Sequence, residues 1–240
     1  MGKFWINCLL AFPCMLYFGM GISMPERGKK STVIAGFEMR QELDNNSAQF
    51  LRSYGRTMRK FSQRYGLDWR LVMAVMRAES RFRPQASSHR GAEGLMQIMP
   101  VTQTQIAGEL GFDEGEFRVP YTNIRGGVYY LGKMYRSFDG QGITGDNRMR
   151  FTLAAYNAGA ARIADARTLA KYMNDDPNEW RSVKTSLRLL SRKYSSLHTR
   201  VWDCGKPTSG YYRQWQQTTG YVETIMAYYA EYCKIIPENV

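Results

Sequence analysis

Apolar residues recur every three or four positions along most of the chain after Asn46, which is the spacing of a buried helix face. The first helical segment runs to Tyr65, and the following Gly66 is typical of a helix C-terminus. Asp68 is a candidate N-cap for the next helix. The apolar stripe of this second helix comprises Leu71, Val72, Val75, Ala78, Glu79 and Phe82. The pattern therefore places a carboxylate on a face that periodicity assigns to the core.

The same periodicity predicts helices over most of the remaining chain. Pro100 can open a helix that ends at Leu110 before Gly111, and Asn123 is a candidate N-cap. The other predicted helices span residues 124–138, 148–173 with a break at 157–159, 178–197 and 218–236, with a connector at 139–147. No segment shows a convincing run of alternating strand positions, so the predicted fold class is all-α.

The first 23 residues have a different pattern from the rest. Residues 4–22 carry no charge and follow a short basic start, which is typical of a secretory leader or an N-terminal membrane anchor. Cleavage, retention as an anchor and lipid attachment at Cys14 remain alternatives. Residues 24–46 are mixed and charged and are predicted to be a tether. One domain is predicted over residues 47–235, in an exported protein.

Cysteine content and net charge limit the chemistry. Outside the leader the cysteines are Cys204 and Cys233, and two cysteines in an exported chain suggest one disulfide, with two buried free thiols as the alternative. Two histidines and the absence of a CxxC pair give no zinc signature, so no metal or cofactor is expected. The net charge of +12 favours acidic partners. The basic residues are spread along the chain without a nucleic-acid-binding motif, which argues against nucleic acid.

Glu79 is the strongest catalytic candidate on chemical grounds. It follows Val75 by four positions and therefore shares its helix face. Burial disfavours the charged form of a carboxyl and raises its pKa, which keeps a proton available for general acid catalysis near neutral pH. The alternative is a helix-end glutamate paired with Arg77, Arg81 or Arg83. Periodicity alone does not decide between these two interpretations.

Four motifs in order make the chain similar to a known family. They are "ES" at 79–80 with the following "ASSHRGAEGLMQIMP", then "NIRGG", "AYNAG" and "YVETI". In this combination residues 47–233 resemble the soluble lytic transglycosylase family, which shares its fold with goose-type lysozyme. The segment "DPNEWRSVKTSLRLLSRKY" resembles the F-type subgroup of membrane-bound murein transglycosylases. That subgroup tends to carry a glutamate where this chain has Gln217 in "RQWQQTTGYV".

The resemblance implies a role for each matching residue. Glu79 matches the catalytic acid/base, and the Tyr156 hydroxyl would orient it or its substrate. The substrate-binding positions that the resemblance implies are Ser80 after the catalytic residue, Ser88 in a loop near the substrate, Gly94, Leu95, Met96 and Gln97 in the groove wall, Asn157 beside the catalytic residue, and Tyr221 in the last motif.

The resemblance also implies the reaction and the partner. Glu79 would protonate the glycosidic oxygen between N-acetylmuramic acid and N-acetylglucosamine in peptidoglycan strands. The 2-acetamido oxygen of the substrate would support the oxocarbenium-like centre, and Glu79 would then deprotonate the C6 hydroxyl to give a 1,6-anhydromuramoyl end. The expected location is the periplasm or the envelope membrane surface of a bacterium, with possible anchoring through the N-terminal segment.

Two alternatives to this function remain open from the sequence. A muramidase of the same fold would add water and would use a second acid, but the candidates lie in loop-like sequence. These are Asp113, Glu114, Glu116, Asp139 and Asp146. A non-catalytic cell-wall binding module would not need an acid on a buried helix face.

Overall fold

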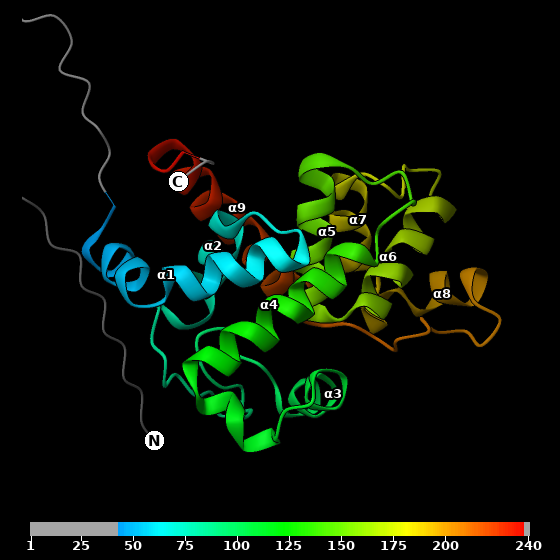
Figure 1. The fold of residues 1–240 in the computed structure, drawn as a ribbon. Helices are drawn as coiled ribbons and strands as arrows, with labels where there is room; N and C mark the ends of the chain where they lie inside the picture. The colour runs from blue at the N-terminus through cyan, green and yellow to red at the C-terminus, as the bar shows by residue number, and fades with distance from the viewer. Residues whose placement is uncertain (1–42, 238–240) are drawn as a thin grey trace, which may run out of the picture. The chain divides into compact units, whose positions relative to one another are not determined.

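The computed structural model describes residues 43–237, which form a helical domain (Figure 1). Within these residues the backbone contains nine α-helices and two short 3-10 helices, and its only β-structure is a pair of isolated bridges. The helices are α1 (Asn45–Tyr65), α2 (Trp69–Ser80), α3 (Pro100–Leu110), η1 (Glu114–Arg118), α4 (Pro120–Arg136), α5 (Gly145–Ala158), α6 (Ala160–Tyr172), α7 (Trp180–Leu189), η2 (Arg192–Tyr194), α8 (Ser195–Val201) and α9 (Trp215–Ile235). The predicted all-α class is confirmed.

The N-terminal predictions fall mostly beyond this region. The leader or anchor at residues 1–23 and the tether as far as residue 42 lie outside the described residues. The last residues of the predicted tether already belong to α1, which begins at Asn45. Among residues 43–237, none of the helices combines the length and the apolar character needed to cross a bilayer.

Several helix ends lie where local sequence signals place them. Gly66 adopts a left-handed conformation with φ 70° at the end of α1, and the Asp68 side chain accepts a 2.8 Å hydrogen bond from the Arg70 amide at the start of α2. Gly111, with φ 69°, ends α3 as predicted. Gly159, with φ 94°, separates α5 from α6. Such ends follow from the φ preference and capping ability of single residues.

Several predicted helix boundaries are wrong. Helix α4 begins at Pro120 instead of after Asn123, and α5 begins at Gly145 inside the predicted connector. The single helix predicted over 178–197 is divided into α7 and α8. The end of α7 is held by distant partners, because the Leu189 carbonyl bonds Nε2 of His198 at 2.7 Å and the Leu190 carbonyl accepts from the Tyr212 amide at 3.0 Å. These contacts replace the hydrogen bonds that would continue the helix.

Helix α2 lies at the centre of the packing around Glu79. Each residue from Leu71 to Met76 is at most 1% exposed, so α2 is surrounded by other elements along most of its length. It packs against α1 and α9, while α4 packs along α1 and α5, and α9 also contacts α5 (Figure 1). Only the C-terminal end of α2, at Glu79, reaches the accessible side of the domain.

The predicted disulfide is wrong, because Cys204 and Cys233 are both free thiols. The alternative of two buried thiols also fails, since Cys204 is exposed. Cys233 lies near the C-terminal end of α9, about 27 Å along the helix from Trp215 at a rise of about 1.5 Å per residue. Figure 1 places that end of α9 and helix α8, which precedes Cys204, on opposite sides of the domain. A disulfide requires Cα atoms within about 7 Å of each other.

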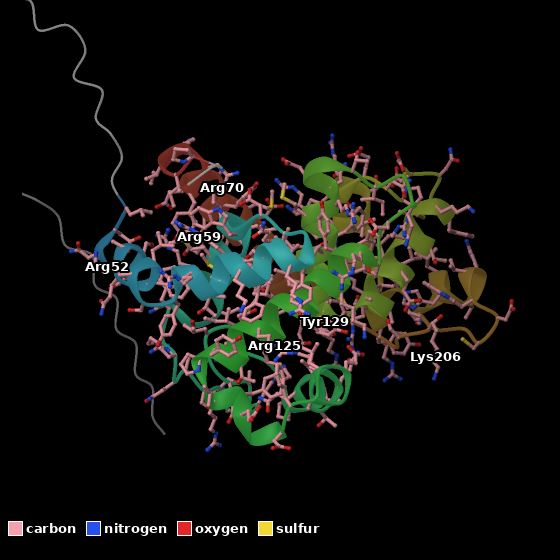
Figure 2. The ribbon with its side chains drawn as sticks, viewed as in Figure 1. Arg52, Arg59, Arg70, Arg125, Tyr129 and Lys206 are labelled. Carbon is pink, nitrogen blue, oxygen red and sulfur yellow. The ribbon has the colours of Figure 1, made fainter. Side chains whose placement is uncertain are left out.

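Basic side chains occur throughout the domain instead of forming one stripe. Figure 2 shows Arg52 and Arg59 on α1, Arg125 on α4 and Lys206 beyond α8, on elements that span the whole view. This distribution agrees with the even spread of lysine and arginine along the sequence.

Candidate active site

Glu79 lies one residue before the C-terminus of α2, and one tyrosine contacts its carboxyl group. The Tyr221 hydroxyl, from α9, donates a 2.7 Å hydrogen bond to Oε1 of Glu79. Burial raises the pKa of Glu79 from its ordinary value of 4.5 to about 7, and the bond from Tyr221 opposes this shift. A group with this pKa exchanges a proton near neutral pH, as a general acid/base requires.

The alternative of a helix-end ion pair is wrong. Nη1 of Arg77 donates a 3.0 Å hydrogen bond to Glu231, and its guanidinium lies 4.1 Å from the centre of the Tyr228 ring. Nε of Arg83 donates to the Ser80 carbonyl at 3.0 Å. Across residues 43–237 no basic side chain forms an ion pair with Glu79, so its carboxyl group has no cation to lower its pKa.

The backbone turns sharply directly after Glu79. The Ser80 hydroxyl donates to the Met76 carbonyl at 3.0 Å and is 1% exposed, so the side chain predicted to bind substrate instead bonds its own helix. Arg81 and Phe82 then adopt left-handed conformations with φ 53° and 61°. Such conformations cost about 1–2 kcal/mol each for residues with a Cβ. The Phe82 ring offsets part of this cost by stacking on Phe50, with ring centres 4.5 Å apart.

Side-chain hydrogen bonds order the loop between α2 and α3. Isolated bridges join Glu93 to Ser87 and to Ile98. The Ser88 hydroxyl accepts a 3.0 Å bond from the Ala92 amide, so this predicted substrate residue holds its own turn. Nε2 of Gln97 donates at 3.0 Å to the carbonyls of Ala86 and Gly94. Ser88 and Gln97 are both partly exposed, so their remaining polar atoms are available to a ligand.

Asn123 is the residue that clamps this loop onto α4. Its Oδ1 accepts from the Met96 amide at 2.9 Å, and its Nδ2 donates to the carbonyls of Glu93 at 2.9 Å and Phe117 at 3.0 Å. Gly94 has φ 77°, and a Cβ there would lie 2.2 Å from the Asn123 Nδ2 atom. The helix-cap interpretation of Asn123 is therefore wrong. Its position at the start of the "NIRGG" motif was a signal for a role in the site.

Leu95 and Met96 lie in the core and not in a groove wall. Both side chains are 0% exposed, so in this conformation neither can contact a ligand.

The backbone of Met96, by contrast, helps to position Tyr156, because the Met96 carbonyl accepts a 2.8 Å hydrogen bond from the Tyr156 hydroxyl. That hydroxyl is therefore not bonded to Glu79. Burial, with the nearby charge of Glu79, raises the pKa of Tyr156 well above its ordinary range, so it remains a neutral donor.

Asn157 connects the end of α5 to the start of α9. Its Oδ1 accepts a 2.7 Å bond from the Thr218 hydroxyl, which also bonds the Tyr212 hydroxyl at 2.5 Å. The N-cap of helix α6 is Gly159, so Asn157 lies before that helix. Asn157 is exposed, and within residues 43–237 its amide nitrogen makes no hydrogen bond that would compete with a ligand.

The family model for the transglycosylase SLT domain matches residues 56–180. This range contains Glu79, the loop that Asn123 clamps, and Tyr156. The chain belongs to the transglycosylase SLT domain family.

Named relatives agree with this membership. The chain is 38% identical over 172 residues to membrane-bound lytic murein transglycosylase F of Desulfosudis oleivorans. The aligned residues cover 71% of this chain and 34% of that relative. The chain thus spans about a third of the length of the curated relatives it matches.

Two solved structures are similar in fold. The 70 kDa soluble lytic transglycosylase of Escherichia coli matches with 25% identity and a TM-score of 0.54, over 81% of this chain and 26% of that one. An inactive glutamate-to-glutamine mutant of lytic transglycosylase Slt from Pseudomonas aeruginosa matches with 25% identity and a TM-score of 0.50, over the same shares. The predicted lysozyme-like fold is confirmed.

Surface depressions of the SLT domain follow the segment after Glu79. A cavity of about 490 Å³ is lined by Ala78, Arg81 and Tyr221 among others. A neighbouring cavity of about 530 Å³ shares Arg81 with it. Further cavities of about 450 and 370 Å³ both contact residues 84–87. Tyr221, which lines the first cavity, connects it with the Glu79 carboxyl.

A second constrained carboxylate in the SLT domain was missed from the sequence. The side chain of Glu93 is 20% exposed. Its Oε1 accepts a 2.9 Å bond from Nε of Arg118, and its Oε2 accepts from Gln103 at 3.3 Å. Its place in the "GAEGLMQ" run could have revealed it. Because Arg118 and Gln103 each bond one of its two oxygens, Glu93 has a structural role in holding this loop.

Proposed function

We propose that the SLT domain, residues 47–235, is a peptidoglycan lytic transglycosylase with Glu79 as its single general acid/base. The observation that carries the proposal is the environment of Glu79, where burial raises the carboxyl pKa to about 7 and Tyr221 is the hydrogen-bond donor. The relatives named as lytic transglycosylases, and the inactive glutamate-to-glutamine mutant among them, support the same reaction.

In the first step Glu79 acts as an acid. With a pKa of about 7, much of the carboxyl is protonated near neutral pH and can donate to the oxygen of the bond between N-acetylmuramic acid and N-acetylglucosamine. As that bond to C1 breaks, the 2-acetamido oxygen of the substrate supports the positive charge at C1. The Tyr221 hydroxyl stabilises the carboxylate that remains, because its hydrogen bond favours the charged form.

In the second step the same carboxylate acts as a base. It removes the proton from the C6 hydroxyl of the muramoyl sugar while that oxygen bonds to C1, which closes the 1,6-anhydro ring and reprotonates Glu79. No water is consumed, and no second acid is needed. Glu93, the other constrained carboxylate near this loop, is engaged by Arg118 and Gln103, which supports a mechanism with one acid.

Substrate binding in this proposal uses accessible polar groups and not the buried part of the motif. Ser88, Gln97 and Asn157 are partly or fully exposed and retain hydrogen-bonding atoms for sugar hydroxyls or acetamido groups. Tyr156 contributes by its hydrogen bond to the Met96 carbonyl. Gly94 contributes because it has no Cβ, which leaves space for the Asn123 side chain. Leu95 and Met96 contribute only packing and backbone.

We place the protein in the bacterial cell envelope, with residues 1–23 as leader or anchor. The charge pattern of that segment and the word "membrane-bound" in the names of the relatives support this location. The basic surface, with a formal charge of +12 for the chain, would retain the enzyme at a wall whose peptide substituents carry carboxylates.

Product analysis tests the proposal. The full chain, purified in detergent, is incubated with peptidoglycan sacculi, and soluble products are identified by mass spectrometry. We expect muropeptides that end in 1,6-anhydromuramic acid, and none above background from Glu79→Gln. Hydrated ends, heavier by one water, would make the protein a muramidase. Normal turnover by Glu79→Gln would remove Glu79 from the mechanism.

A further inference from the structure

The 490 Å³ cavity lies one side chain away from the Glu79 carboxyl. Tyr221 lines this cavity, and the hydroxyl of the same residue bonds Oε1 of Glu79. Ala78, the neighbour of Glu79 in sequence, also lines it. The Tyr221 side chain therefore connects a ligand in the cavity with the Glu79 carboxyl.

Arg81 is the uncommitted cation of this cavity. The other lining arginine, Arg77, bonds Glu231 and the Tyr232 hydroxyl and stacks on Tyr228. Arg81 is exposed, and across residues 43–237 no carboxylate forms an ion pair with its guanidinium. Its five N–H donors are therefore free for an incoming acceptor.

The backbone holds Arg81 in a conformation that helices avoid. Its φ of 53° is left-handed, and its amide still donates to the Arg77 carbonyl at 3.0 Å. The next residue, Phe82, is also left-handed and is fixed by its stacking on Phe50. Two successive strained residues that are both held by their surroundings are a feature of functional sites. Here the strain turns the chain so that Arg81 lines two neighbouring cavities.

The remaining groups of the cavity leave this positive charge available. Gln217 also lines the cavity, so α9 contributes an amide and no negative charge to the lining. The lining carboxylate, Asp44, accepts from the Ser47 amide at 3.0 Å and the Ser47 hydroxyl at 2.7 Å. It is thus engaged as the N-cap of α1. An anion that enters the cavity would meet the Arg81 guanidinium and the Gln217 amide, while the Asp44 carboxylate, which its bonds from Ser47 stabilise, also lines the cavity.

We propose that this cavity binds a carboxylate of the peptide substituents on the glycan strand, with Arg81 as the recognition residue and Gln217 as a second donor. The proposal rests on the proposed function, which supplies a substrate whose side peptides carry free carboxylates. It makes the enzyme selective for strands that bear charged peptides beside the cleaved bond. Arginine suits this role because its planar fork matches a carboxylate.

The test compares native sacculi with sacculi whose carboxylates have been converted to amides by carbodiimide and ammonia. Initial rates of anhydro-product release and sedimentation of the full chain with the sacculi are both measured. The variants are Arg81→Gln, Arg81→Lys, which keeps the charge, and Arg188→Gln. Arg188 is an exposed arginine on α7 outside the cavity, so its variant controls for loss of one positive charge.

For the wild type we expect amidation to lower kcat/KM and sacculus binding about three- to ten-fold, the range for one accessible charged hydrogen bond. Arg81→Gln should lose a comparable factor on native sacculi, and amidation should lower its rate and binding by less than it lowers those of the wild type, because only the attraction of the remaining basic surface is then lost. Arg81→Lys should recover part of the difference, and Arg188→Gln should respond to amidation as the wild type does.

Two results would overturn the inference: a wild type that binds and cleaves both substrates equally, or an Arg81→Gln variant whose binding and rate still fall on amidation as much as those of the wild type. Failure of the proposed function looks different. In that case no anhydro product forms from either substrate, while the sedimentation assay still shows whether Arg81 recognises the carboxylates.

Discussion

The hydroxyl of Tyr221 donates a 2.7 Å hydrogen bond to Oε1 of Glu79, across 142 residues of sequence. Helix α9 thereby supplies the group that stabilises the ionised form of a carboxyl which burial would keep protonated. The two opposing effects leave the pKa of Glu79 at about 7, so both of its protonation states are accessible near neutral pH.

Tyr221→Phe should move the alkaline limb of the pH–rate profile upward. Removing the bond removes an effect that lowers the pKa of Glu79, so the pKa rises above about 7 and the acid form persists to higher pH. The rate at the optimum should fall about ten-fold or more, because the carboxylate loses a donor worth about 1.5–3 kcal/mol. Anhydro-product release measured between pH 5 and 9, chosen to bracket a pKa of about 7, checks both effects.

Tyr156→Phe is the matched control for that experiment. Its hydroxyl bonds the Met96 carbonyl and not Glu79, so the variant should lose rate without moving the alkaline limb. An equal shift of the limb in both variants would show that the bond from Tyr221 does not set the pKa of Glu79.

Glu79→Gln should stabilise the fold at alkaline pH. The folded pKa of about 7 lies above the ordinary value of 4.5, so the folded state binds the proton more tightly than the unfolded chain does. The contribution of Glu79 to stability is fully present below pH 4.5 and is lost as pH rises through about 7. The loss amounts to up to about 3 kcal/mol.

Urea unfolding of both proteins near pH 4 and pH 8 measures this linkage. The free energy of unfolding of Glu79→Gln relative to wild type should be higher at pH 8 than at pH 4. A difference between the two proteins that is independent of pH would contradict a raised pKa at Glu79.

Gly94→Ala should unfold the loop that Asn123 clamps. The added Cβ would lie 2.2 Å from the Asn123 amide nitrogen, and the φ of 77° is unfavourable for alanine. We expect a loss of about 3 kcal/mol or more in the free energy of unfolding, from overpacking together with backbone strain. Gly111→Ala separates the two causes, because it has φ 69° and nothing within 4 Å of the new Cβ. Its loss should be about 1–2 kcal/mol, and equal losses at both sites would rule out the clash.

Cys204→Ser should leave stability unchanged. Both thiols are free, so the melting temperature should be the same for variant and wild type and should not respond to a reducing agent. Cys204 is exposed and should react with a thiol reagent before Cys233 does in the folded protein. Peptide mapping without reduction provides the check, since a linked peptide containing both cysteines would contradict the structure.

The sequence by itself determined the features that depend on neighbouring residues. The ends of helices at Gly66 and Gly111, the cap at Asp68 and the break at Gly159 follow from the φ range or hydrogen bonds of a single residue. Periodicity put Glu79 on a buried face and thus gave the direction of its pKa shift. The order of the motifs identified the family and the lysozyme-like fold.

Only the tertiary structure decided which groups meet. Asn123 reaches Met96 across 27 residues and Tyr221 reaches Glu79 across 142, and a sequence pattern does not specify such partners. Burial is likewise a property of the whole domain, so it took the packing of all the helices to place Leu95 and Met96 in the core and to leave Arg81 beside an accessible cavity. The physical reason is range: backbone preference and capping act over a few residues, while desolvation and side-chain hydrogen bonds depend on elements that only folding brings together.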